Sequence, residues 1–130
     1  MKPINLELII ERSMFNGALY FLNHYRKEMT IDNDDIHFFI DQMLYNEREY
    51  FHHEEENHLY VVINIDFKDE LHVQVIGAFL TAICAEAMKN NCQEMYDVGL
   101  ELFSSLMSSA YDVDKKLYDS LKIALERGEA

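Results

Sequence analysis

Residues 58–85 read HLYVVINIDFKDELHVQVIGAFLTAICA, and the change of pattern inside this stretch decides the fold. From His58 to Phe67, apolar side chains alternate with partly polar ones and β-branched residues dominate, which predicts a β-strand. A single strand leaves backbone groups without partners, so the strand needs another strand beside it. If the chain offers none, the segment is an extended linker across the core or pairs with a second chain, which would make a dimer.

Two predictions compete for the residues that follow. A hairpin would turn through Lys68 and Asp69 into a second strand, Glu70–Ile76. Alternatively, Asp69 is the N-cap of a helix that runs from Glu70 to Asn90. We favour the helix, because apolar residues recur at helical spacing, namely Val73, Ile76, Leu80, Ile83 and Ala87.

The remainder of the chain has helical periodicity and few helix breakers, with four Gly and one Pro. The sequence predicts a mainly α protein, a single compact domain over residues 1–130 built as a bundle of about five helices. It leaves room for one short β-hairpin or strand around residues 59–76. The first predicted helix starts near Pro3. The second starts after an N-cap at Asp32 or Asn33 and ends near Asn57. The third starts at Glu70 and the fourth near Met95. The fifth is capped by Asp112 and closes at Gly128.

The charge balance restricts the possible partners. The chain of 130 residues has 24 acidic residues against 11 Lys and Arg, a formal charge of −13. Such a surface repels phosphate backbones and anionic lipids, so we expect no direct binding to nucleic acid or membrane. A basic protein partner would be attracted. Solubility alone is the simpler explanation of the same charge.

The cysteines, the N-terminal segment and the length of the longest uncharged stretch favour a cytoplasmic protein. Cys84 and Cys92 would lie about 12 Å apart on one helix, too far for a disulfide. Glu7 and Glu11 interrupt the N-terminal segment where a signal peptide needs an apolar core. The longest uncharged stretch, Leu71–Ala85, has 15 residues, which suits a buried helix and is too short for a membrane span.

The stretch EYFHHEEENH, residues 49–58, resembles a metal site in composition but not in spacing. On a helix His53 and His58 would point about 140° apart. Glu49 and His52 match one half of the Glu-x-x-His pattern of di-iron bundles, which need a second such pair on a facing helix, and one such match is expected by chance in so acidic a chain. Since no nucleophile or phosphate-binding motif is present either, we expect no cofactor, no metal and no enzymatic activity. A helical-bundle metalloenzyme using Glu49 and His52 is retained as an alternative.

The second predicted helix carries the candidate partner-binding face. Residues 28–56 contain ten acidic residues and one base, Arg48. Phe38 and Tyr45 lie seven residues apart on the polar side, and aromatic residues ringed by carboxylates are typical of interface hot spots. Alternatively, Phe38 packs against the first helix and the face is merely solvated. The predicted contact residues are Asp34, Asp35, Phe38, Asp41, Tyr45, Glu49, His52 and Glu56.

These features favour a stoichiometric inhibitor that covers the active site of a basic partner. Immunity proteins and antitoxins that neutralise nuclease-type toxins are similar in type, being small, acidic and cofactor-free. The similarity is one of profile and not of any sequence motif. A DNA mimic that blocks restriction or other defence proteins and an acidic secretion chaperone are the alternatives in the binding class. The oligomeric state stays open.

Overall fold

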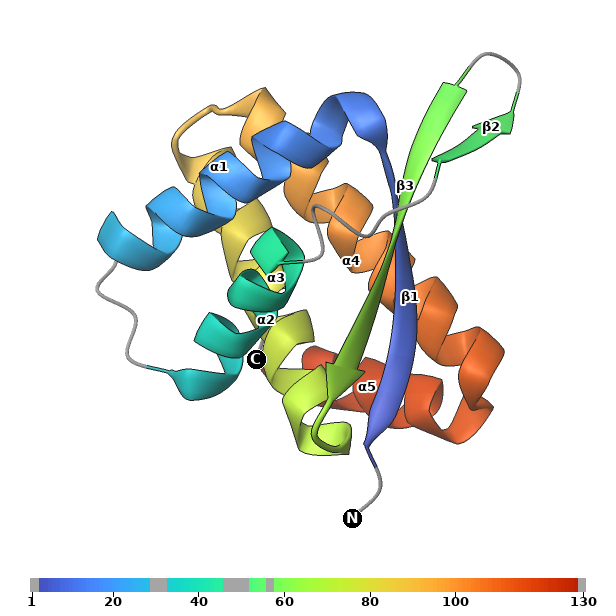
Figure 1. Cartoon of the computed structure of the whole chain (residues 1–130). Coiled ribbons are helices and arrows are strands. Elements are labelled where there is room, and N and C mark those ends of the chain that lie inside the picture. The colour runs from blue at the N-terminus through green and yellow to red at the C-terminus, as the bar shows by residue number, and fades with distance from the viewer. Residues whose placement is uncertain (1–2, 29–32, 46–51, 56–57, 129–130) are drawn as a thin grey trace.

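The computed structural model describes residues 3–28, 33–45, 52–55 and 58–128 of the chain (Figure 1). In chain order the elements are β1 (Ile4–Glu11), α1 (Arg12–Glu28), α2 (Asp34–Tyr45), β2 (His52–Glu55), β3 (His58–Phe67), α3 (Glu70–Lys89), α4 (Gln93–Val113) and α5 (Lys115–Gly128). Within these ranges the protein is mainly α, with five helices and a small antiparallel sheet, as predicted.

The sheet has the strand order β1-β3-β2, so β3 lies at its centre. Leu6 and Leu8 of β1 stand opposite Ile65 and Ile63, while His53 of β2 stands opposite Tyr60. The strand predicted from His58 to Phe67 is therefore confirmed. Both of its neighbours come from the same chain, so neither an extended linker nor a second chain is needed to pair it.

The prediction of a helix starting near Pro3 is wrong for residues 4–11, which form β1. Leu6, Leu8 and Ile10 are buried, and the residues between them are exposed. This period of two is that of a strand with one buried face. The first helix starts only at Arg12.

The second predicted helix is shorter than expected. Its N-cap is Asn33, whose side-chain oxygen accepts the Asp35 and Ile36 N–H groups at 2.9 and 3.1 Å. It ends at Tyr45, and His52–Glu55 is a strand, so the prediction of a helix to Asn57 is wrong. In the structure, residues 52–55 pair with β3, and this long-range pairing is not visible in the local helix propensity of the sequence. Residues 46–51 and 56–57 lie outside the described residues.

The helix predicted after Asp69 is confirmed, and the hairpin alternative for Glu70–Ile76 is wrong. Asp69 caps α3, because its carboxylate accepts the His72 N–H at 2.9 Å. By length and composition α3 could cross a bilayer. Its apolar stripe, including Ile76 and Leu80, is buried against the rest of the protein, as in a core helix.

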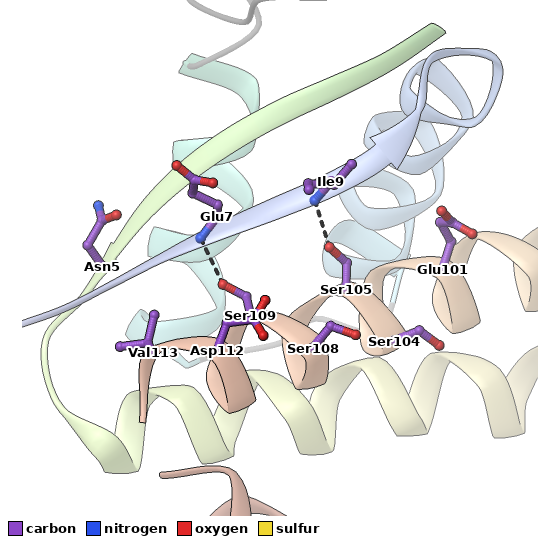
Figure 2. Close-up of a pocket in the computed structure, with 10 residues that line it drawn as sticks. All are labelled: Asn5, Glu7, Ile9, Glu101, Ser104, Ser105, Ser108, Ser109, Asp112 and Val113. Carbon is purple, nitrogen blue, oxygen red and sulfur yellow. Dashed lines mark hydrogen bonds between the residues drawn. The ribbon is translucent and has the colours of Figure 1, made fainter. Parts of the chain in front are cut away.

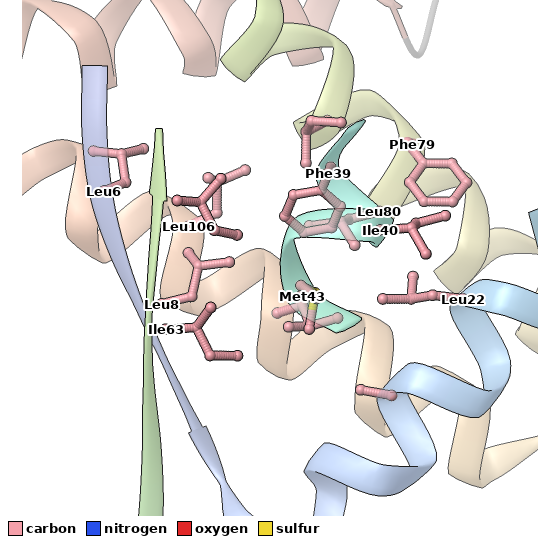
Figure 3. Packing of buried hydrophobic residues seen from close by; sticks show 14 of the residues in the cluster. Leu6, Leu8, Leu22, Phe39, Ile40, Met43, Ile63, Phe79, Leu80 and Leu106 are labelled. Carbon is pink, nitrogen blue, oxygen red and sulfur yellow. The ribbon is translucent and has the colours of Figure 1, made fainter. Parts of the chain in front are cut away.

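The core lies between the inner face of the sheet and the helices. In Figure 3 the side chains of Leu8 and Ile63 from the sheet point toward those of Met43 on α2 and Leu106 on α4. Figure 1 shows α4 running along β1, and these two elements are in contact. This arrangement leaves the outer edge of β1 beside α4.

The boundary between the last two helices differs from the prediction by two residues. Asp114, and not Asp112, precedes α5, and its carboxylate accepts the Lys116 N–H at 2.9 Å. Asp112 and Val113 belong to the last turn of α4. Both therefore lie close to the start of β1 and line the groove described below.

Candidate partner-binding surface

Two of the acidic residues predicted on α2 already have cationic partners within the chain. Asp35 forms an ion pair with Lys68. Asp41 accepts a hydrogen bond from Arg26 Nη1 at 2.7 Å, although its side chain stays 65% exposed. Asp34 is exposed at the start of the helix. The described part of this face is therefore less negative than its carboxylates alone suggest.

Phe38 is half-buried and packs within the protein. Its ring meets the imidazole of His72 edge-on, with the centroids 5.4 Å apart. This contact lies on α3, whereas the packing alternative placed Phe38 against the first helix.

The predicted contact residues do not share one helix. Tyr45 is the last residue of α2, and His52 belongs to β2. Glu49 and Glu56 lie outside the described residues. The helical Glu-x-x-His pattern was predicted for Glu49 and His52, but His52 belongs to a strand. Among the described residues no group of three or more His, Cys, Asp or Glu is placed to hold a metal ion.

A groove between β1 and α4 gathers carboxylates and hydroxyls, and we call it the acidic groove (Figure 2). Its volume is about 490 Å³. The residues that line it are Asn5, Glu7, Ile9, Glu101, Ser104, Ser105, Ser108, Ser109, Asp112 and Val113.

Helical spacing on α4 builds one wall of the acidic groove. From Glu101 to Asp112, polar residues recur every three or four positions and so share one face of the helix, with four serines between the two acids. Serine is small, which lets the backbone of β1 come close. The opposite stripe of α4, with Leu102 and Leu106, is buried in the core.

Two of these serines close the edge of the sheet. Ser105 Oγ accepts the Ile9 N–H at 2.6 Å, and Ser109 Oγ accepts the Glu7 N–H at 3.0 Å (Figure 2). An edge strand normally offers such N–H groups to an incoming strand. Since the Glu7 and Ile9 N–H groups are bonded to α4, a partner would contact side chains here and would not pair with these two groups.

Carboxylates give the described lining of the acidic groove a negative charge. Glu7, Glu101 and Asp112 line it, and none of its described lining residues is Lys or Arg. Partial burial raises the pKa of Glu101, and the nearby charge of Glu11 raises it further. The negative charge of Glu11, which contributes to this raised pKa, would also attract an ammonium or guanidinium group brought to the groove.

Sequence reasoning missed the acidic groove because it treated α4 only as a core helix. A signal was present, since SSLMSS at residues 104–109 places four serines on one face of a helix. No Lys or Arg occurs between Lys89 and Lys115. The contact between α4 and β1, however, could not be predicted, because residues 4–11 were predicted to be helical.

Comparison with known proteins finds no family model that matches the chain, no similar curated protein and no similar solved structure. The surface chemistry is therefore the basis for the function considered next.

Proposed function

We propose that this protein is a stoichiometric inhibitor that binds a basic protein partner through the acidic groove. The observation that carries the proposal is the groove itself, along which three carboxylates lie with no Lys or Arg among the described lining residues. Carboxylates arranged in this way accelerate encounter with a basic surface and fix its orientation. The net charge of −13 acts in the same direction at longer range.

The partner class that fits best is a nuclease-type toxin, which would make this chain an immunity protein or antitoxin. A nuclease site is electropositive because it holds phosphates, so a carboxylate-lined surface complements it. We expect such an inhibitor to act in the cytoplasm, where Cys84 and Cys92, which are free thiols in the structure, stay reduced. No cofactor is required for this role.

The proposal is tested by affinity capture from nuclease-treated lysate of the source cells. We expect one basic protein to be retained at low salt in near-equal amount and to be released as the salt is raised, because screening weakens the contact. Retention of no basic protein would contradict the proposal.

The second step distinguishes an inhibitor from a mere binding protein. The captured partner is titrated with this chain while its activity is followed, and inhibition should be complete at one chain per partner. Partial inhibition at saturation would argue for a chaperone. Displacement of the chain by duplex DNA of any sequence would favour the DNA mimic.

A further inference from the structure

A second groove lies on the other side of the exposed ridge of α4, between α4 and α5, and we call it the aromatic groove. Its volume is about 610 Å³. The residues that line it are Phe103, Ser104, Met107, Ser108, Tyr111, Asp112 and Tyr118. Phe103 and Met107 pack on the core with one side, and Tyr111 is 52% exposed.

The aromatic groove has the properties of a binding pocket for an apolar side chain. Tyr111 and Tyr118 meet edge-to-face with their ring centroids 5.2 Å apart, which holds both rings in place. Tyrosine buries a large area at small cost in side-chain entropy, and methionine adapts its shape to what it contacts. Burial of an apolar group here would not displace any described cation, since no Lys or Arg lines the groove.

The two grooves adjoin each other. Ser104, Ser108 and Asp112 line both, so the acidic groove and the aromatic groove are separated only by this row of α4 side chains. The carboxylate of Asp112 marks their common border. A ligand that fills both must therefore carry an apolar group directly beside positive charge.

We propose that the aromatic groove receives an apolar side chain that the basic partner carries between arginine or lysine residues, while those cations occupy the acidic groove. This inference rests on the proposed function and adds which residues the partner's contact segment contains, namely an apolar residue between basic ones. A second copy of this chain is a poor occupant, because each copy carries a formal charge of −13 and no Lys or Arg occurs in residues 90–114.

The test uses the full chain with ¹³C-methyl-labelled methionine and three short synthetic peptides. The first has one leucine flanked on both sides by arginines, the second replaces the leucine by serine, and the third replaces the arginines by glutamates. The Met107 methyl signal is assigned with the variant Met107→Leu. We expect the first peptide to shift this signal in a saturable way and to bind roughly tenfold or more tightly than the second.

A pair of variants links the shift to the groove. Tyr111→Ser should weaken binding of the leucine–arginine peptide severalfold. Tyr20→Ser, a matched control at a tyrosine that is 65% exposed on α1, should leave it unchanged. Equal weakening by both variants would overturn the assignment to the aromatic groove.

The outcomes separate this inference from the proposed function. If the arginine peptides shift the amide signals of Glu101 and Asp112 but never the Met107 methyl, the inference is wrong and the acidic groove stands. If no peptide shifts either set, both are wrong. Equal binding of the glutamate peptide, or a Met107 shift that follows the chain's own concentration, would also overturn the inference, the latter in favour of self-association.

Discussion

Gly99 on α4 faces α3 at a point with no room for a side chain. A methyl group added there would lie 2.8 Å from Cys84 Sγ and 3.3 Å from Ile83 Cγ2. The first distance is shorter than a van der Waals contact allows, so either the Cys84 side chain would have to turn aside or the two helices would have to move apart. Gly99 is thus the residue that sets how closely α3 and α4 pack.

We predict that Gly99→Ala lowers the free energy of unfolding by roughly 1–3 kcal/mol, the usual cost of overpacking. Chemical denaturation measures this change. Gly17→Ala on α1 is the control, since its added methyl group would meet Val98 Cγ2 at an ordinary 3.9 Å. That variant should gain up to about 1 kcal/mol from helix propensity. A Gly99→Ala protein as stable as the parent would refute the close packing.

His72 is a fully buried polar residue whose two ring nitrogens are both used. Nδ1 accepts the Lys68 N–H at 3.0 Å, and Nε2 lies 3.2 Å from the Asp35 carbonyl oxygen. Because a carbonyl can only accept, Nε2 carries the proton and the imidazole is neutral. The ring also packs edge-on against Phe67, at 5.0 Å between centroids. His72 therefore joins α2, α3 and the turn after β3.

Replacing His72 by Phe keeps an aromatic ring in place and removes both hydrogen bonds. We expect a loss of about 1–3 kcal/mol in unfolding free energy, because the partly buried Lys68 N–H and Asp35 carbonyl lose a partner. The same substitution at the exposed His24 should change stability by less than about 0.5 kcal/mol. Thermal and urea unfolding compare the two variants, and equal stabilities would show that the His72 contacts contribute nothing.

Glu101 makes the acidic groove sensitive to pH. Its pKa in the folded protein is raised by burial and by Glu11, so the folded state holds a proton more tightly than the unfolded chain. Its contribution to stability is therefore fully present below the unfolded pKa and is lost as the pH rises through the folded pKa. Glu101→Gln removes this dependence.

We expect Glu101→Gln to be more stable than the parent at neutral pH and equal to it below about pH 4, under the unfolded pKa of glutamate. Urea denaturation at a series of pH values gives the difference. A difference that grows as the pH falls would have the wrong sign and would contradict the raised pKa.

At the scale of elements, the contact of α4 with the edge of β1 rests on Ser105 and Ser109. Amide hydrogen exchange reports each bond separately. We predict that Ser105→Ala speeds exchange at the Ile9 amide and that Ser109→Ala does so at the Glu7 amide, each roughly two- to tenfold. The neighbouring variants Ser104→Ala and Ser108→Ala serve as controls and should change neither amide. Unchanged exchange in all four variants would mean that the edge of β1 is not protected by α4.

Elements defined by local signals could be predicted from the sequence. The Asp69 cap is followed directly in the sequence by the apolar stripe of α3, so both the helix and its start could be predicted. The strand at residues 58–67 was visible from its alternation and its β-branched residues.

Elements that depend on distant partners could not be predicted. Leu6, Leu8 and Ile10 alternate, but Leu8 also continues at helical spacing into α1, and only pairing with β3 decides between the two patterns. The glutamates in residues 54–56 favour a helix locally, yet Glu54 and Glu55 pair with β3. The acidic groove was missed for the same reason, since it needs β1 beside α4.

Across the whole molecule the charges are unevenly distributed. The neighbouring elements β1, β3 and α4 together contain seven Asp and Glu and no Lys or Arg. The cations of the described residues lie in α1, α3, α5 and the turn that contains Lys68. Two of these cations, Arg26 and Lys68, offset acids of α2 by pairing with Asp41 and Asp35. A basic partner would therefore be oriented toward β1 and α4 (Figure 1).

The most direct test of this orientation compares two triple variants in the same capture experiment. One neutralises the acidic groove, with Glu7→Gln, Glu101→Gln and Asp112→Asn. The other neutralises α2, with Asp34→Asn, Asp35→Asn and Asp41→Asn, and so removes the same number of charges. Circular dichroism first establishes that both variants are folded.

We predict that the groove variant no longer retains the basic partner, whereas the α2 variant retains it as the parent does. Loss of the partner in the α2 variant together with its retention by the groove variant would contradict the account and return the contact surface to the face of α2.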